Sequence, residues 1–226
     1  MDGILVVDKP QGCTSHDVVD FIRKRFGLKK VGHAGTLDPM ATGVLVILIG
    51  KHTKSSNSFL SADKEYDATL MLGATSDTGD AWGRVEKLGS PGALGKKEIE
   101  ETFNKFLGEI EQVPPSYSAV KFKGKKLYEL ARSGISVKIA PRKVVIKKLE
   151  ISKIDMPEVS FTVTCSKGTY IRQLSADIGS ALGCGAYLSR LRRTRSGRFM
   201  LEDAITMERL KSLSPDELKA KLKYDE

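Results

Sequence analysis

One loop of the sequence holds a carboxylate in a constrained position. The stretch "GHAGTLDPMATG", residues 32–43, contains three glycines, His33 and a single acidic side chain, Asp38. Asp38 precedes Pro39, which biases its backbone to the extended region and makes the loop stiff. Two interpretations follow: a turn-forming carboxylate that hydrogen-bonds its own backbone, or a reactive group held in place by a rigid loop.

Three further residues are of the types that assist a reactive carboxylate. Tyr170 and Arg172 lie two positions apart in "CSKGTYIRQLSADIG", where a strand is expected to turn into a helix, so both side chains can face one cleft. An arginine beside an aspartate keeps the carboxylate ionised and orients it for nucleophilic attack. Tyr66, in "KEYDATL", offers a flat face on which a base can stack. Taken singly, the tyrosines are equally compatible with core packing and the arginine with a surface charge.

Several common catalytic motifs are missing from the sequence. The stretch from Gly43 to Gly50 ends in Lys51-His52, which does not fit the GxxxxGKS or GxxxxGKT pattern of a phosphate-binding loop. There is no GxGxxG and no HExxH, and the three histidines are not part of a recognisable metal-binding motif, so no dinucleotide or metal site is predicted. A Ser-His-Asp or Cys-His hydrolase stays open, although no serine lies in a GxSxG turn.

The charge of the chain indicates a polyanionic partner. The net charge is +9 and the pI is about 9.4. Clustered basic residues favour contact with a nucleic acid backbone, and the alternative is an ordinary solvated surface. The three basic clusters are Lys121, Lys123, Lys125 and Lys126; Arg142, Lys143, Lys147 and Lys148; and Arg190, Arg192, Arg193, Arg195 and Arg198.

Cysteine usage and hydropathy indicate a cytoplasmic protein. Cys13, Cys165 and Cys184 form no CxxC pair, so neither a disulfide framework nor a zinc site is expected. The first residues, "MDGILVVDKP", do not have the pattern of a signal peptide. No apolar stretch approaches the roughly 18 residues that a membrane-spanning helix needs.

The order of the predicted elements indicates an α+β fold. Apolar runs predict strands, and capping residues with helical spacing predict helices. Strands are expected at 3–7, 43–50, 65–72, 143–152, 158–165 and from 186; helices are expected at 14–27, 97–107, 125–130, 170–182 and after 214. Because the elements follow no regular βαβ repeat, we expect a mixed or antiparallel sheet.

Local signals define two of these helices and one loop. Thr14 and Asp17 have the spacing of a capping box at the start of the first helix. The helix at 97–107 carries apolar residues on one face, the last of them Leu107. The stretch "GATSDTGDAWG", residues 73–83, is rich in turn formers and predicts a long loop.

Five blocks of the sequence, and a sixth that follows them, resemble the TruB family of tRNA pseudouridine synthases, in the order the family has them. The resemblance covers nearly all of residues 3–199. It implies an α+β pseudouridine synthase catalytic fold with a mixed, mainly antiparallel central sheet flanked by helices and loops. The blocks are "GILVVDKPQGCTSHDVV", "VGHAGTLDPMATGVLVILIG", "KEYDATLMLGATSDTGDAWG", "VPPSYSAVKFKGKKLYELARSG", "CSKGTYIRQLSADIG" and "GAYLSRLRRTRSGRF".

The resemblance implies which residues carry the reaction. Asp38 matches the catalytic aspartate of pseudouridine synthases, and Arg172 matches the arginine that pairs with it. Tyr66 matches the tyrosine that stacks on the target uracil, while Tyr170 and Leu191 match residues that line the pocket.

Three further positions match residues of the RNA-binding surface and of the site's surroundings. His33 matches the histidine that enters the RNA loop where bases have left the stack. Lys9, with Pro10 in the "KPxGxTS" block, is expected to support the active-site loop, and Asp80 matches a polar residue near the site.

The activity implied is isomerisation of uridine to pseudouridine at position 55 in the T arm of tRNA, with the base flipped out of its loop. The resemblance implies no cofactor, no metal and no obligate protein partner, and we expect a monomer. The same chemistry on another RNA and a non-catalytic tRNA-binding or folding protein are the alternatives.

The resemblance also gives an expected domain organisation. Residues 1–200 should form the catalytic domain, and residues 201–226 a short helical tail with helices near 206–223. Many bacterial members carry a C-terminal PUA domain, for which these residues leave no room.

Overall fold

A computed structural model describes residues 1–92 and 94–224. The chain divides into two compact units. The first consists of Met1–Asp67 together with Leu191–Glu226, and the second of Ala68–Arg190. Two strands, β4 (Lys64–Leu72) and β12 (Ala186–Ser196), are continuous through the boundary, so each unit contains part of both.

The first unit is built on β3 (Thr42–Ile49), whose last seven residues are all buried. β1 (Gly3–Lys9) runs antiparallel along β3 over its whole length. β2 (Val31–Ala34) is also antiparallel to β3, and β12 is parallel to it at Arg192 and Arg193. β-branched and leucine side chains fill this layer, as a strand buried on both faces requires.

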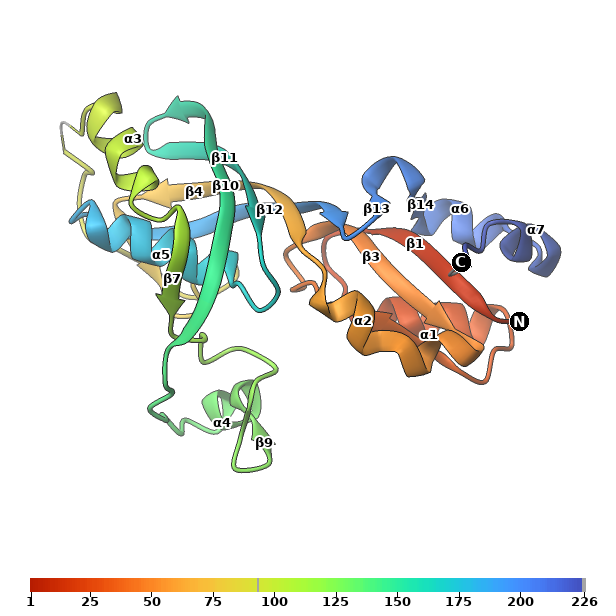
Figure 1. Ribbon diagram of the computed structural model, residues 1–226. Helices are drawn as coiled ribbons and strands as arrows, with labels where there is room; N and C mark the ends of the chain where they lie inside the picture. The colour runs from red at the N-terminus through yellow and green to blue at the C-terminus, as the bar shows by residue number, and fades with distance from the viewer. Residues whose placement is uncertain (93, 225–226) are drawn as a thin grey trace. The chain divides into compact units, whose positions relative to one another are not determined.

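Short elements complete the first unit (Figure 1). α1 (Ser15–Arg25) has Thr14 as its N-cap residue and packs against β2. The remaining elements are η1 (Gly50–Ser55), α2 (Ser56–Ser61), β13 (Phe199–Met200), η2 (Leu201–Asp203), β14 (Ile205–Thr206), α6 (Met207–Ser212) and α7 (Pro215–Ala220).

The second unit is an antiparallel layer with helices against it. β10 (Arg142–Asp155) pairs with β11 (Glu158–Cys165) on one side and with β7 (Gly108–Gln112) on the other. Figure 1 shows β10 and β11 as one long hairpin. α3 (Lys96–Asn104) packs against β10 and α5 (Ile171–Ala181), with the Phe103 ring edge-on to Phe161. The smaller elements are β5 (Ala74–Ser76), β6 (Val85–Lys87), β8 (Lys121–Phe122), β9 (Lys125–Lys126) and α4 (Leu127–Arg132).

The structure confirms the α+β class and the mixed, mainly antiparallel sheet. It also confirms the first helix, where Thr14 and Asp17 form the capping box in both directions. The helix expected at 97–107 ends at Asn104, and Leu107 is 43% exposed. The chain turns there into β7, so Leu107 does not continue the buried face.

Backbone pairing also changes two predicted loops. Ala74–Ser76 pairs with Val85–Lys87 to make a hairpin inside the stretch expected to be a long loop. Val31–Ala34, which overlaps the start of the glycine-rich loop, pairs with β3. Short strands of this kind depend on a partner strand and carry little signal of their own.

The segment after residue 200 is part of the first unit. Ile205 and Thr206 pair in parallel with Val7 and Asp8 of β1, and the backbone of Lys223 exchanges two hydrogen bonds with Ile4. Helices occur where they were expected, at α6 and α7, and the domain boundary at residue 200 stays a prediction. None of the described helices is long and apolar enough to cross a membrane.

Candidate active site

The backbone on both sides of Asp38 is held by hydrogen bonds. The Leu37 amide donates to Ser15 Oγ at 2.8 Å, and Ser15 Oγ donates back to the Leu37 carbonyl at 3.1 Å. The Asp38 carbonyl accepts from the Ala41 amide at 3.0 Å, closing a turn. Asp38 is therefore a half-buried carboxylate on a fixed backbone.

Lys9 lies completely buried under this loop. Its Nζ donates to the carbonyls of Cys13 at 2.7 Å, Pro10 at 2.9 Å and Pro39 at 3.5 Å. The Pro39 carbonyl also accepts from the Gly12 amide at 3.0 Å. One ammonium group thus joins the loop after β1 to the residue that follows Asp38, which is the geometry that a supporting role for Lys9 needs.

The electrostatics of Lys9 include Asp38. Burial lowers the pKa of Lys9, while the nearby Cys13 and Asp38 side chains act in the opposite direction and Arg193 adds to the lowering. A buried ammonium is costly unless its donors are satisfied, and three carbonyls satisfy them here.

Arg193 is a second buried cation beside the loop. It is 1% exposed, its Nε donates to the Val44 carbonyl at 2.7 Å, and Nη2 donates to the Gly35 carbonyl at 2.9 Å. β12 approaches β3 so closely that a side chain at Gly43 would collide with the Arg193 carbonyl. Gly43 therefore permits strand contact, and the arginine holds the loop at both ends.

This burial removes Arg193 from the third basic cluster as a contact for a polyanion, whereas Arg190 and Arg198 of that cluster are exposed. Arg193 is inaccessible, Arg192 makes a 2.8 Å ion pair with Asp8, and Arg195 lies 3.4 Å from Glu65. The first two clusters differ, since their lysines on β8, β9 and β10 are mostly exposed.

His33 occupies β2, opposite Ile47 of β3. Burial lowers the pKa of His33, and the positive charges of Arg193 and His16 lower it further, which favours the neutral imidazole at pH 7. Its buried Nδ1 atom has no hydrogen-bond partner among the described residues.

Tyr66 and Leu191 are the remaining predicted residues of the first unit. Tyr66 lies on β4 and Leu191 on β12, and each is 8% exposed. Thr42 Oγ1 donates to the Leu191 carbonyl at 3.5 Å, next to the strand contact at Gly43.

In the second unit the structure brings Arg172 and Asp80 together. Arg172, on α5, is 4% exposed, and its Nη1 and Nη2 donate to the carbonyls of Thr78 at 2.7 Å and Tyr117 at 2.9 Å. Its Nε lies 3.7 Å from Asp80 Oδ2. Asp80 Oδ1 accepts from Thr78 Oγ1 at 2.8 Å and from the Trp82 amide at 3.0 Å. The guanidinium is thereby fixed in orientation.

Tyr170, at the start of α5, is held by a residue that the sequence did not suggest. The Tyr170 amide donates to Gln112 Oε1 at 3.0 Å, and Gln112 Nε2 donates to the Tyr170 carbonyl at 3.3 Å. Gln112 is 2% exposed. A buried polar residue at the end of a strand has no recognisable sequence signal, because its partner lies 58 positions away.

The predicted residues thus fall into two groups. Lys9, His33, Asp38, Tyr66 and Leu191 belong to the first unit, while Asp80, Tyr170 and Arg172 belong to the second. Because Asp38 and Arg172 belong to different units, their pairing stays a prediction.

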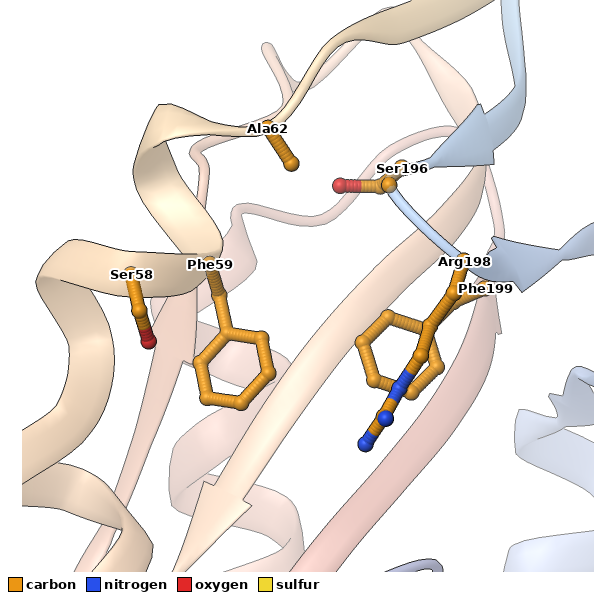
Figure 2. A pocket seen from close by; sticks show the side chains of 7 residues that line it. Ser58, Phe59, Ala62, Ser196, Arg198 and Phe199 are labelled. Atoms are coloured by element: carbon orange, nitrogen blue, oxygen red, sulfur yellow. The ribbon is translucent and has the colours of Figure 1, made fainter. Parts of the chain in front are cut away.

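A cavity of about 530 Å³ lies apart from these residues, in the first unit (Figure 2). It is lined by Ser58, Phe59, Ala62, Ser196, Gly197, Arg198 and Phe199. Two of its polar side chains have partners: Ser58 Oγ donates to the Ser55 carbonyl, and Arg198 lies over the Phe199 ring and donates to the Tyr224 carbonyl. The two phenylalanine rings pack against each other with centroids 5.9 Å apart. This cavity is a gap beside core aromatic residues and offers no converging polar groups.

Comparison with known sequences identifies the family. Residues 23–171 match the family model described as "TruB family pseudouridylate synthase (N terminal domain)". Residues 172–223 match the model described as "tRNA pseudouridylate synthase B C-terminal domain". The chain belongs to the TruB family. It is therefore a pseudouridine synthase, an isomerase.

Curated relatives agree with this assignment. A protein of Syntrophotalea carbinolica named tRNA pseudouridine synthase B is 46% identical to this chain over 96% of its residues. A protein of the same name from Alkaliphilus oremlandii is 51% identical over 94% of this chain. The match covers 71% of the length of each relative. The relative from Opitutus terrae is 43% identical over 98% of this chain and 92% of its own length.

Solved structures of similar chains give the same TruB-like fold. A chain in a Cbf5-Nop10-Gar1 complex is 37% identical with a TM-score of 0.73, over 91% of this chain and 52% of that one. A chain in an H/ACA RNP bound to a substrate RNA containing 2'-deoxyuridine is 32% identical with a TM-score of 0.72. That match covers 98% of this chain and 56% of the other. This protein thus spans about half the length of those chains.

Proposed function

We propose that this protein converts the uridine at position 55 in the T loop of tRNA to pseudouridine, with Asp38 as the catalytic aspartate. The family assignment supplies the reaction class, and the curated relatives are named for tRNA. The reaction breaks the bond between N1 of uracil and C1′ of ribose, turns the base, and joins it again through C5.

The observation that carries the proposal is the fixed backbone of the Asp38 loop. Residues 37, 38 and 39 all have backbone atoms in hydrogen bonds, to Ser15, Ala41 and Lys9 respectively. A carboxylate that must reach one atom of a flipped nucleotide gains rate from such preorganisation, because little motion has to be frozen in the transition state. A turn-forming aspartate would need no buried lysine beneath it.

The other residues have separate roles in the proposal. Arg172 keeps Asp38 ionised and orients it, and Tyr66 stacks on the uracil. Tyr170 and Leu191 line the pocket, and His33 enters the space that flipped bases leave.

Binding of the RNA needs both backbone and base contacts. A base inside a folded RNA loop must leave the stack before its glycosidic bond can be reached, at a cost of a few kcal/mol. The exposed lysines of β8, β9 and β10 supply positive charge for the RNA backbone. The proposal includes action as a cytoplasmic monomer, without cofactor, metal or obligate protein partner.

The test uses a T-arm stem-loop RNA and the purified protein without added cofactor. Wild-type protein should form pseudouridine at the position equivalent to 55, measured by chemical mapping or mass spectrometry. The Asp38→Asn variant should lose turnover by about 10⁴-fold or more, the scale seen when an essential group is removed, while RNA affinity changes little.

A matched control is Asp216→Asn, an exposed carboxylate in the first turn of α7. It should retain turnover within about threefold. Normal turnover by Asp38→Asn would refute the proposed mechanism. Binding without turnover by wild-type protein would instead favour a tRNA-binding protein, and modification of only another RNA would change the substrate.

A further inference from the structure

Trp82, the only tryptophan of the chain, is 53% exposed. A tryptophan offers 150–250 Å² of surface for burial, so leaving more than half in water forgoes much stabilisation. Single exposed apolar residues are common and need no explanation by themselves. The surroundings of Trp82 therefore decide whether its exposure has a function.

The segment that carries Trp82, residues 77–84, is firmly held. The Trp82 amide donates to Asp80 Oδ1 at 3.0 Å, and the Ala81 amide donates to the Leu188 carbonyl at 3.0 Å. The Arg84 amide donates to Asp77 Oδ1 at 2.8 Å. A side chain at Gly83 would collide with other atoms of this segment, which shows how tightly it is folded. The backbone of Trp82 is thus fixed while its indole is exposed.

The segment is also attached to Arg172. The Thr78 carbonyl accepts from Arg172 Nη1 at 2.7 Å, and Asp80 forms the ion pair with Arg172 Nε. Trp82 is two residues from Asp80, whose Oδ1 atom accepts from the Trp82 amide. The exposed indole therefore lies in the segment that orients the arginine of the candidate active site.

We propose that Trp82 stacks on an unpaired base of the RNA substrate, next to the nucleotide that is modified. The inference rests on the proposed function, because the ligand is that enzyme's RNA. A nucleobase fits the site better than an apolar protein surface, because the chain carries a net charge of +9 and Arg84, two residues on, is exposed for a phosphate. Rigid aromatic platforms accept any base, since every base has a π-face.

The first experiment uses the indole as its own reporter. Because Trp82 is the only tryptophan, fluorescence excited at a wavelength selective for indole reports on this position alone. Titration of wild-type protein with the T-arm stem-loop should quench the emission with the same midpoint as the anisotropy of labelled RNA. Unchanged emission at saturating RNA would overturn the proposal.

The second experiment separates stacking from folding. Trp82→Ala should weaken RNA binding about 5- to 150-fold, the range for loss of one base stack, with kcat at saturating RNA within about twofold. Trp82→Phe keeps an aromatic face and should restore most of the affinity. Leu88→Ala, which removes another exposed apolar side chain of the same unit, should leave affinity unchanged.

The outcomes distinguish this proposal from the proposed function. Quenching and loss of affinity without any pseudouridine formation would remove the enzymatic function and leave the stacking contact. Pseudouridine formation with Trp82→Ala binding RNA as wild type does would overturn the stacking contact, and a protein-binding role for Trp82 would then be tested instead.

Discussion

The regions around Asp38 and around Arg172 are held in opposite ways. Around Asp38, buried cations hold the backbone: Lys9 and Arg193 donate to carbonyls of the loop, and the carboxylate is presented. Around Arg172, backbone carbonyls and the carboxylate of Asp80 hold a buried cation. In one region buried cations hold the backbone, and in the other backbone carbonyls and a carboxylate hold a cation.

This difference predicts which substitutions lower stability and which lower turnover. The Asp38 loop depends on two cations that make no direct contribution to the chemistry, so their loss should appear first in stability. At the Arg172 site the side chain proposed to act in the reaction is also the anchor, so changes there should appear first in turnover. The following predictions test this contrast.

The largest effect is expected for Arg193→Met. The change leaves the carbonyls of Gly35 and Val44 without their charged donor, and hydrogen bonds to charged groups contribute about 1.5–3 kcal/mol each. We expect the free energy of unfolding, measured by urea denaturation, to fall by about 3–5 kcal/mol.

The neighbouring arginine provides the control for this change. Arg192 is 41% exposed at the side chain and pairs with Asp8, so Arg192→Gln should cost below about 1 kcal/mol. Equal losses for the two variants would contradict the structural role of Arg193.

A smaller effect, on turnover rather than stability, is expected for Asp80→Asn. The side-chain oxygen of the asparagine can still accept from the Trp82 amide, but the negative charge beside Arg172 Nε is lost. We expect kcat to fall about tenfold and the free energy of unfolding to fall by only about 1–2 kcal/mol. A stability loss as large as that of Arg193→Met with unchanged kcat would reverse the contrast between the two regions.

The smallest effect is a pH dependence from His33. Because the folded pKa of His33 is lowered, the unfolded chain binds a proton that the folded chain resists. The contribution of the neutral His33 to the free energy of unfolding is complete above about pH 6.5, the ordinary pKa of histidine. It decreases as the pH falls below that value and is lost once the pH has passed through the lower folded pKa. Urea denaturation between pH 7.5 and 5 should show the decline.

His33→Gln should flatten that decline, whereas His16→Gln should keep most of it, because the His16 side chain is 71% exposed. An identical pH profile for His33→Gln and wild type would contradict the lowered pKa.

Local signals predicted much of the fold. The capping box at Thr14 and Asp17 located α1, and the apolar run of β3 identified a buried strand, because both patterns act within a few residues. The predicted strands at 65–72 and 158–165 correspond to β4 and β11 within one residue. Elements of two to five residues, such as β2 and β7, were missed because their pairing partners define them.

The site was predicted less completely than the fold. Family resemblance named the charged residues, and the structure joined Asp80 to Arg172. The resemblance could not indicate Gln112, which holds the Tyr170 backbone, or the Tyr117 carbonyl, which accepts from Arg172. Contacts to backbone atoms leave no trace in residue types.

The sequence by itself determined the family, the first helix, the buried central strand and the position of Asp38 before a proline. Only the tertiary structure decided which positive charges are accessible. Arg193 lies among basic residues for which the sequence allowed a polyanion contact or a solvated surface, yet it is buried, and folding brings the Gly35 carbonyl, 158 residues away, within 2.9 Å of its Nη2 atom. Hydrogen-bond acceptors on distant backbone make a buried cation stable, and spacing along the chain carries no information about them.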